Sequence, residues 1–574
     1  MIYFLIFLNG FKFFGLEYTP PGFYVDEVAG VVQALCLLQT GRDFYGDFLP
    51  LFAPGVNDAF YTPAYLYGQA AWAALFGNSI FALRAFIAFI SALTIGLLYA
   101  WIKNESSKKI ALYVAFAATI MPWSFHFSRI AWDPPLGVFF LIAALWANRR
   151  FANAFLTAAL LTLAAYSYSP LRIAIPLIWL FYPGVNLKSK AWVCLWGLLL
   201  AIPLILQMQI PEFMARSELR SLWSPYSTNA YRNFDSMQLV WIGIKQFAAH
   251  FSPQFLFFGG DQNPRHSIGL FGQLSYLDGA ALILGVLTWI ILRFKKSSLA
   301  CFSDAEKKLL IIALLGIVSN VIPAALTNEG NPHALRTIGC WPFYAILTGV
   351  LLHFLSRVFN SRRVHIGALC IGILFFSLYQ YRLYWHYPAM AKAYFLPDAS
   401  KINQAYALMT EQKMRCTDVP KEGKPRLPDE LVRITLKRPI LFNPKGYGSL
   451  YLGAHWHEQE PWGIWSQPEG AMLRFTNVPT KTRAIAFDLK TIISPSHPEQ
   501  ALHVRVNGGP IQIFTLKDAN SNTVVVPINP SDMNDARSLE IQFTTPGSVT
   551  PIEAKISADD ARSLGIGLMS ARFQ

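Results

Sequence analysis

Charged residues are scarce in this chain of 574 residues. Asp, Glu, Lys and Arg make up 14% of it, hydrophobic residues make up 53%, and the mean hydropathy is +0.34. These values exclude a single soluble domain and indicate a protein that crosses a membrane several times. The net charge of +14 does not by itself indicate a nucleic-acid partner, because the positions of Lys and Arg follow a membrane topology. We therefore predict no nucleic-acid binding.

Cysteine is also scarce, and the six cysteines are scattered without a CxxC pair or a framework spacing. We therefore expect neither a disulfide scaffold nor a thiolate metal site. The N-terminus lacks the basic region and the small-residue cleavage site of a signal peptide. We interpret it as a first spanning helix.

Long apolar segments recur along the first two thirds of the chain. A spanning helix needs roughly 20 predominantly apolar residues. About eleven segments approach this length, near residues 1–16, 79–102, 109–124, 134–148, 151–166, 172–184, 191–209, 277–293, 308–326, 338–356 and 364–384. The chain is thus predicted to be a polytopic α-helical membrane protein over residues 1–385.

The connections between these segments alternate in charge. One set is short and basic, at residues 103–109, 149–150, 188–190, 293–308 and 357–363, and the positive-inside rule makes it cytoplasmic. The other set then faces outward and includes the long loops 17–78 and 210–276. An odd number of spans places the region after residue 386 on the outer side as well. We therefore expect the C-terminal domain on the outer side of the membrane.

The first outer loop carries two adjacent acids, Asp26 and Glu27. Apolar residues after them fall on one helical face up to Gly41, which predicts an amphipathic helix lying along the membrane. A second interfacial helix is predicted from Thr62–Pro63 to Gly77. Asp26 has two interpretations, as the N-cap of its helix or as a functional acid.

The composition changes after residue 386. Residues 386–425 are predicted to hold a membrane-proximal helix (398–413) and a linker, and residues 426–574 an all-β sandwich. Short alternating strands are expected at 431–436, 471–475, 483–489, 502–506, 511–516, 523–527 and 539–544, separated by turn residues.

Several cations stand at the outer ends of the predicted spans, where the topology does not require them. They are Arg129, Arg172, His266, His333 and Arg336. Cations at membrane depth are costly, by about 2.5 kcal/mol or more each, and normally face a polar cavity. Together they suggest an anion site opposite the acids. Each arginine alone could instead extend to lipid phosphates, and His266 alone fits a structural histidine.

An acid facing a group of arginines suits a specific chemistry. A carboxylate can accept a proton from a hydroxyl while guanidinium groups bind a departing phosphate. This pairing suits the attack of an alcohol on a sugar whose leaving group is a lipid phosphate.

The stretch PPGFYVDEVAGVVQALCLLQTGRDFYGDFLPLF resembles the first outer loop of GT-C glycosyltransferases in the protein mannosyltransferase and aminoarabinose transferase group. FGNSIFALR, FHFSRIAWD, YSYSPLR, NPRHS and NPHALRTIG add to the resemblance, which covers residues 1 to about 385. The resemblance implies a multispan fold with interfacial helices, a polyprenyl-phosphate-linked sugar donor and an inverting transfer.

By motif match, the resemblance makes Asp26 the catalytic base and Glu27 a supporting residue. It assigns the donor phosphate to Arg129, Arg172 and Arg336. From their positions at the ends of the spans, we add His333 and His266 to this predicted phosphate site. One departure is that NDAFYTPAYLY, before and at the start of the second interfacial helix, has no basic residue. Some members of the group use a divalent metal. Here Glu27 with His266 could bind one, but we expect no metal and no other cofactor.

The C-terminal stretches EPWGIWS and SADDARSLGIGLMSARF resemble jelly-roll domains of the galactose-binding type. Trp456, Trp462 and Trp465 either stack on a sugar or belong to the sandwich core, and the second interpretation is favoured. Carbohydrate binding here is an analogy only.

The sequence therefore predicts a glycosyltransferase that moves one sugar from a polyprenyl phosphate to an envelope glycan, lipid or protein. Its partners would be the lipid bilayer, the lipid-linked sugar and that acceptor. One alternative is a transporter or flippase of polyprenyl-linked sugars or lipids without transferase activity. Another is an envelope-assembly protein whose β domain binds glycan while the spans only anchor it.

Overall fold

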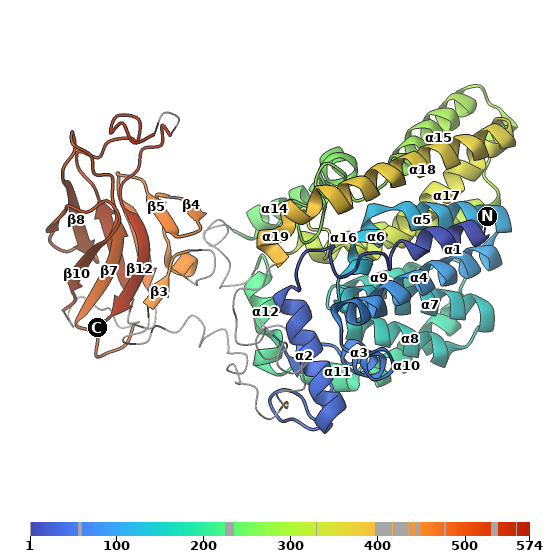
Figure 1. Cartoon of the computed structure of the whole chain (residues 1–574), viewed down its shortest axis with the longest axis horizontal. Helices are drawn as coiled ribbons and strands as arrows, with labels where there is room; N and C mark the ends of the chain where they lie inside the picture. The colour runs from blue at the N-terminus through green and yellow to red at the C-terminus, as the bar shows by residue number, and fades with distance from the viewer. Residues whose placement is uncertain are drawn as a thin grey trace. The chain divides into compact units, whose positions relative to one another are not determined.

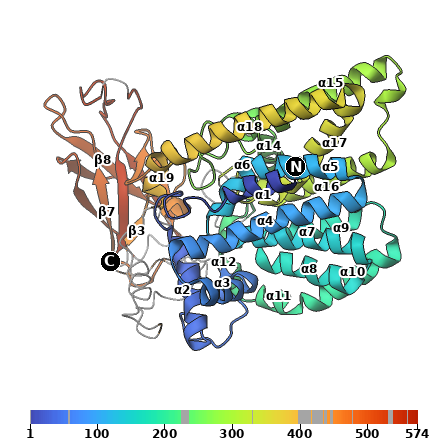
Figure 2. The ribbon, with the colours of Figure 1, turned by 45° about the vertical axis from the view of Figure 1, so that its right-hand side comes forward.

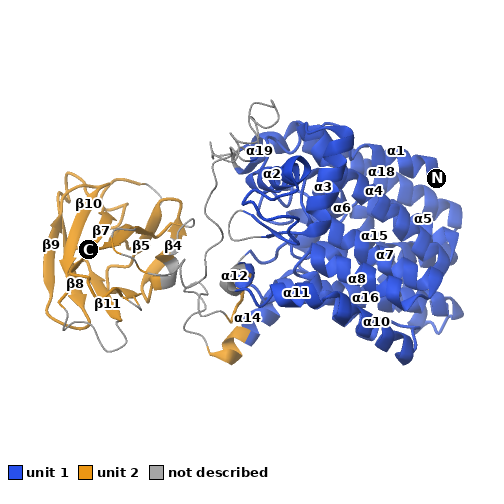
Figure 3. Cartoon of the chain, turned by 90° about the horizontal axis from the view of Figure 1, so that it is seen from below, with its two compact units in different colours: residues 1–216, 240–425 blue, residues 217–239, 426–574 orange. Residues whose placement is uncertain are grey.

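The computed structural model describes residues 2–55, 60–223, 235–328, 330–395, 416, 434, 436, 439–443, 448–475, 478–529, 538–557 and 560–574. It divides into two compact units (Figure 3). The first contains Met1–Arg216 with Val240–Pro425, and the second Ser217–Leu239 with Arg426–Gln574. The predicted helix 398–413 lies outside the described residues, as does the predicted linker after it except for Cys416.

All eleven predicted apolar segments form helices. Five have the length and composition of a membrane span: α4 (Ile80–Glu105), α15 (Tyr276–Phe294), α16 (Asp304–Ala325), η4 with α17 (Ile338–Cys340 and Trp341–Val358) and α18 (Ser361–Trp385). A sixth is α5 (Lys108–Ile120) with α6 (Pro122–His126) and η1 (Phe127–Arg129), which follow it at 61°. The bend falls just before Pro122, which removes a backbone hydrogen bond. The chain is thus a multi-pass membrane protein.

The other segments give shorter helices: α1 (Ile2–Gly10), α7 (Pro134–Phe151), α8 (Ala154–Ser167), α9 (Leu171–Phe181), α10 (Leu187–Leu200) and α11 (Ile202–Gln207). Pro203 separates α11 from α10 at its first turn, and Pro176 lies inside α9. Helices α4, α7, α8 and α10 lie side by side in this order (Figure 2). These four helices form one side of the first unit.

The first outer loop contains both predicted interfacial helices, α2 (Val25–Thr40) and α3 (Pro63–Phe76). Gly41 ends α2 in the left-handed conformation, as a C-terminal glycine commonly does. A short ribbon of β1 (Ala53–Pro54) and β2 (Phe60–Tyr61) lies between the two helices in the chain. Both helices are labelled in Figure 1. Further elements are α12 (Pro211–Arg220), α14 (Ser236–Ala249), the π-helical turn η2 (Gln254–Phe258), η3 (Ser298–Ala300) and α19 (Tyr387–Phe395).

The second unit contains a β-sandwich. One sheet has the order β10-β7-β12-β5-β4, with β3 also on β12, and the other has the order β6-β11-β8-β9. Their strands are β3 (Pro439–Leu441), β4 (Trp456–Glu460), β5 (Gly463–Ser466), β6 (Ala471–Phe475), β7 (Ala484–Lys490), β8 (Gln500–Val506), β9 (Gln512–Leu516), β10 (Asn522–Pro527), β11 (Leu539–Thr544) and β12 (Gly567–Phe573). Residues from both sheets share one hydrophobic core, so the predicted sandwich is confirmed.

The tryptophans of the sandwich differ in their surroundings. Trp456 packs against the shared core, as predicted. Trp465 packs against a small separate cluster, and Trp462 is partly exposed with the Lys490 ammonium 4.5 Å from its ring centre. The core interpretation therefore holds for Trp456 alone.

A disulfide joins Cys36 of α2 to Cys416, 380 residues later in the chain. Both half-cystines are buried, and the backbone N–H of Cys416 donates to the side chain of Gln39. The cysteines show no framework spacing, and the expectation that no disulfide scaffold forms is corrected for this one pair. Spacing rules fail here because they describe local pairs, whereas this pair closes a very long loop.

We predict that the purified protein, denatured without reductant, reacts with a maleimide reagent at four cysteines. These are the free thiols, Cys194, Cys301, Cys340 and Cys370. After reduction all six cysteines should react, as intact mass will show. The variant Cys194→Ser serves as the control and should lose one label in both conditions. Six labels without reductant would contradict the disulfide.

Candidate active site

Asp26 lies in the first turn of α2, where the helix dipole favours an acid. Tyr24, not Asp26, is the N-cap residue, so the N-cap interpretation of Asp26 is wrong. The Tyr61 hydroxyl donates a hydrogen bond to the Asp26 carbonyl oxygen at 2.8 Å, which fixes the backbone there. The Asp26 Oδ1 atom is buried and, among the described residues, has no hydrogen-bond donor. A reacting hydroxyl could supply one.

The surroundings of Asp26 favour a carboxyl that accepts protons readily. Burial raises its pKa above the ordinary value. The charges of Arg216 and Arg265 and the Tyr24 hydroxyl act in the opposite direction, while the charge of Glu27 raises the pKa slightly further. A carboxylate of raised pKa is a stronger base, as general-base catalysis requires.

Glu27 faces inward, and all its acceptor positions are in use. Its carboxylate accepts two hydrogen bonds from Arg84, at 2.9 and 2.8 Å, and both side chains are fully buried. It also accepts from the backbone N–H of Ala131 at 2.8 Å and of Tyr24 at 3.1 Å. The predicted catalytic role for Glu27 is therefore corrected to a positioning role, because no lone pair remains for a substrate.

Arg129 is likewise a structural residue. It is fully buried, and its guanidinium donates to the carbonyl oxygens of Phe11, Lys12, Phe14, Gly15 and Thr19. It holds the segment that follows α1 and has no donor left for a phosphate. The prediction that Arg129 binds the donor phosphate is wrong for this reason.

Arg172 and Arg336 are the other two arginines predicted to bind the donor phosphate. Arg172 donates to the carbonyl of Ala165 at 3.2 Å and interacts electrostatically with Asp133. Arg336 donates to the Thr327 hydroxyl at 2.6 Å and interacts electrostatically with Tyr168 and His333. Their role in phosphate binding stays a prediction.

His266 and His333 meet around Asp261. The Asp261 carboxylate lies 2.9 Å from His266 Nδ1 and accepts from the backbone N–H of Ala334 at 2.8 Å. The two imidazole rings are 4.7 Å apart, and His250 Nε2 accepts from the backbone N–H of His333 at 3.1 Å. The hydrogen bonds from the backbone of Ala334 to Asp261 and from that of His333 to His250 join the loop before α17 to the segment before α15.

Asp261, His266 and His333 could also hold a metal. Their ligand atoms lie within 4.8 Å of one another. Two imidazoles and one carboxylate suit zinc or a similar divalent ion. Glu27, the earlier candidate partner of His266, is occupied by Arg84. The expected absence of a metal stays a prediction.

Sequence reasoning missed Asp133, Arg216, Arg265 and the hydroxyl of Tyr24. Asp133 lies just before Pro134 at the start of α7, and burial raises its pKa to about 7. It interacts electrostatically with Asp26 and Arg216. The sequence held one signal that could have identified Asp133. It is an acid within the motif FHFSRIAWD and lies on the same predicted side of the membrane as Asp26. Arg265 stacks on Tyr24, with its guanidinium carbon 4.6 Å from the ring centre.

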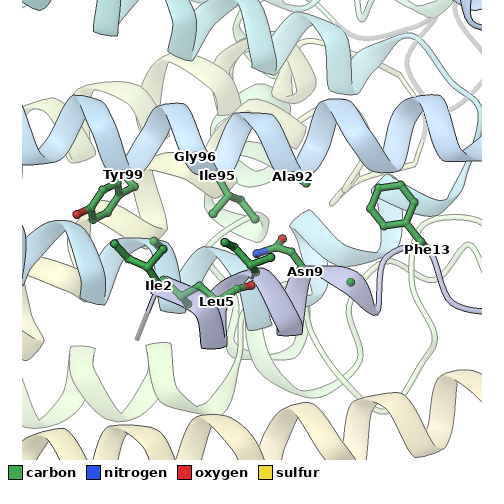
Figure 4. Close-up of a pocket in the computed structure, with 11 residues that line it drawn as sticks. Ile2, Leu5, Asn9, Phe13, Ala92, Ile95, Gly96 and Tyr99 are labelled. Carbon is green, nitrogen blue, oxygen red and sulfur yellow. Dashed lines mark hydrogen bonds between the residues drawn. The ribbon is translucent and has the colours of Figure 1, made fainter.

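An apolar pocket lies elsewhere, between α1, α4 and α5 (Figure 4). Its lining includes Leu5, Asn9, Phe13, Ile95 and Tyr99. None of the predicted site residues lines it. Apolar side chains between spanning helices suit a lipid chain rather than a reaction.

Comparison with known proteins gives likeness in fold only. No family model and no curated protein matches the sequence. Among solved structures, ArnT from Cupriavidus metallidurans bound to undecaprenyl phosphate is 15% identical, over 73% of each chain, with a TM-score of 0.41. AglB from Archaeoglobus fulgidus, with an inhibitory peptide and a dolichol-phosphate, is 11% identical over 74% of this chain and 61% of that chain, with a TM-score of 0.41.

The arabinosyltransferase EmbB from Mycobacterium smegmatis is 10% identical over 98% of this chain and 64% of that chain, with a TM-score of 0.28. All three are GT-C glycosyltransferases. This is the fold group that the sequence resembles. Identities and TM-scores this low assign no activity, and the roles of individual residues rest on the geometry above.

We predict that Glu27→Gln destabilises the protein, whereas Asp26→Asn does not. Removing one partner of a buried ion pair leaves an uncompensated charge and costs about 3–5 kcal/mol. Within the described ranges, Asp26 is not part of such an ion pair, so its replacement by Asn leaves no buried charge without a partner. Thermal unfolding in detergent, followed by intrinsic fluorescence, compares the two variants. A Glu27→Gln protein that unfolds at the wild-type temperature yet has no activity would contradict the positioning role.

Proposed function

We propose that this protein is an inverting glycosyltransferase that uses a polyprenyl-phosphate-linked sugar on the outer side of the membrane. The observation that carries the proposal is Asp26, a carboxyl of raised pKa whose Oδ1 atom is buried and has no hydrogen-bond donor among the described residues. It lies within electrostatic range of Arg216 and Arg265. A base beside cations suits a hydroxyl nucleophile and an anionic leaving group.

In the proposed reaction, Asp26 accepts the proton of the acceptor hydroxyl. The hydroxyl oxygen forms a bond to the anomeric carbon from the face opposite the phosphate, so the configuration inverts. The bond from that carbon to the phosphate oxygen breaks, and its electron pair leaves with the polyprenyl phosphate. Arginines stabilise the released phosphate, because a guanidinium matches two of its oxygens.

The compartment is part of the proposal. A disulfide at Cys36 requires an oxidising environment, which supports placing α2 on the periplasmic side of a bacterial inner membrane. Because Cys416 belongs to the same disulfide, the chain that leads into the β domain would begin on that side too. The sugar and the acceptor are left open, since envelope lipid, glycan and protein all offer hydroxyls.

We predict that Asp26→Asn lowers the rate of sugar transfer by a factor of about 10²–10⁴, the usual contribution of a general base. The assay follows a labelled sugar from its polyprenyl phosphate into envelope extract. Glu17→Gln, an exposed acid of the same outer loop, is the matched control and should keep full activity. Full activity of Asp26→Asn would remove Asp26 as the base. Uptake of the intact lipid-linked sugar without transfer would favour a flippase instead.

We also predict the direction of the pH dependence. A base works in its deprotonated form, so kcat/KM should rise with pH through a range above about 4, the ordinary carboxyl value. Among the described residues, the charged or titratable groups that interact with Asp26 include Tyr24, Glu27, Tyr61, Asp133, Arg216 and Arg265. Arg265→Gln removes a charge that lowers the pKa of Asp26 and should move this rise to higher pH. Lys245→Gln is the control, and a shift to lower pH in Arg265→Gln would contradict the assignment.

A further inference from the structure

Helix α12 is anchored beside the site by one aromatic side chain. Phe213 is buried, and its ring centre lies 4.8 Å from that of Phe52 and 5.1 Å from that of Phe60. The guanidinium of Arg172 lies over the same ring at 5.3 Å. The anchor therefore joins α12 to the first outer loop and to α9.

Residues three apart share one face of a helix. Arg216 therefore follows Phe213 on the face of α12 that contacts the first outer loop. The next residue after Phe60 is Tyr61, whose hydroxyl donates to the Asp26 carbonyl oxygen. The aromatic anchor and the candidate base are thus connected through two neighbouring residues of β2.

The charge of Arg216 acts on groups from several separate segments. It interacts electrostatically with two acids, three tyrosines and a histidine, namely Asp26, Asp133, Tyr24, Tyr61, Tyr168 and His333. These groups come from the start of α2, from β2 and from the loops before α7, α9 and α17. Arg216 is therefore central to the group of charges around Asp26.

The guanidinium of Arg216 is exposed. In the described part of the chain it takes part in no hydrogen bond or ion pair, in contrast to Arg129, whose donors are all used by main-chain carbonyls. Its planar fork is therefore available to a ligand. If Arg216 only balanced the negative charges of Asp26 and Asp133, its guanidinium would not need to keep N–H donors for a ligand.

We infer that Arg216 binds the phosphate of the lipid-linked donor and that Phe213 positions it. The inference rests on the proposed function, and it supplies the phosphate ligand that Arg129 cannot be. The same guanidinium would then neutralise the phosphate as it leaves the sugar beside Asp26.

Binding of undecaprenyl phosphate to the purified protein in detergent tests the inference without any transfer reaction. Arg216→Ala should raise the Kd about ten- to hundredfold, as expected for the loss of charge-assisted hydrogen bonds. Arg216→Lys should show an intermediate loss, because lysine keeps the charge but not the fork. The alcohol undecaprenol should bind all variants as it binds the wild type.

Matched controls separate binding from folding. Arg220→Ala changes the last residue of the same helix and should leave the Kd unchanged. Phe213→Ala should weaken phosphate binding with Arg216 intact, and Phe213→Leu should restore part of it. The Kd values are compared only for variants whose unfolding temperature stays close to that of the wild type. If Arg216→Ala fails to fold, Arg216→Lys provides a second variant. An unchanged Kd in both Arg216 variants, or an equal loss of undecaprenol binding, would overturn the inference.

Steady-state kinetics distinguishes a defect in donor binding from a defect in acceptor binding. Arg216→Ala should raise the KM for the lipid-linked sugar and leave the KM for the acceptor unchanged. A rise confined to the acceptor would overturn the assignment to the donor phosphate. Phosphate binding through Arg216 in a protein without transfer activity would refute the proposed function but not the binding site.

Discussion

The buried pair of Glu27 and Arg84 is the interaction on which the start of α2 and the candidate site depend. Besides Glu27, Arg84 donates to the carbonyl oxygens of Leu16, Pro20 and Gly22. Two buried charges are stable only when every donor and acceptor is satisfied. The start of α2, the N-terminal end of α4 and the turn before α2 must therefore meet. Asp26, the neighbour of Glu27, is fixed by the same contacts.

The pair also explains why two adjacent acids have different environments. Successive residues of a helix point about 100° apart, so the helix that buries Glu27 turns Asp26 toward Tyr24 and the surrounding cations. The N-terminal end of α2 is thus set both by the ion pair of Glu27 and by the hydrogen bond from the Tyr61 hydroxyl to the Asp26 carbonyl oxygen. Little freedom remains for Asp26 except through its own side chain.

The helices were predictable, whereas the partners of the charges were not. Apolar length and the caps Thr62 and Gly41 are local signals, and the structure confirms the helices that they predict. An arginine at the outer end of a span shows only that its charge needs acceptors. Arg129 finds them in main-chain carbonyls and Arg84 finds them partly in Glu27, and such partners are set by tertiary packing. Arg216 could not be distinguished from other loop cations, because its position depends on Phe213 reaching Phe52 and Phe60.

The far part of α2 is held by a second, independent constraint. The disulfide from Cys36 ties this helix to a residue beyond the last span, so α2 is fixed near both ends. Cystine formation favours an oxidising compartment, and the scarcity of Lys and Arg among the short outer connections favours the same side by a different physical effect. One constraint arises from thiol chemistry and the other from the cost of moving charge across a bilayer. Their agreement supports an outward-facing Asp26, where a hydroxyl on an envelope molecule can reach it.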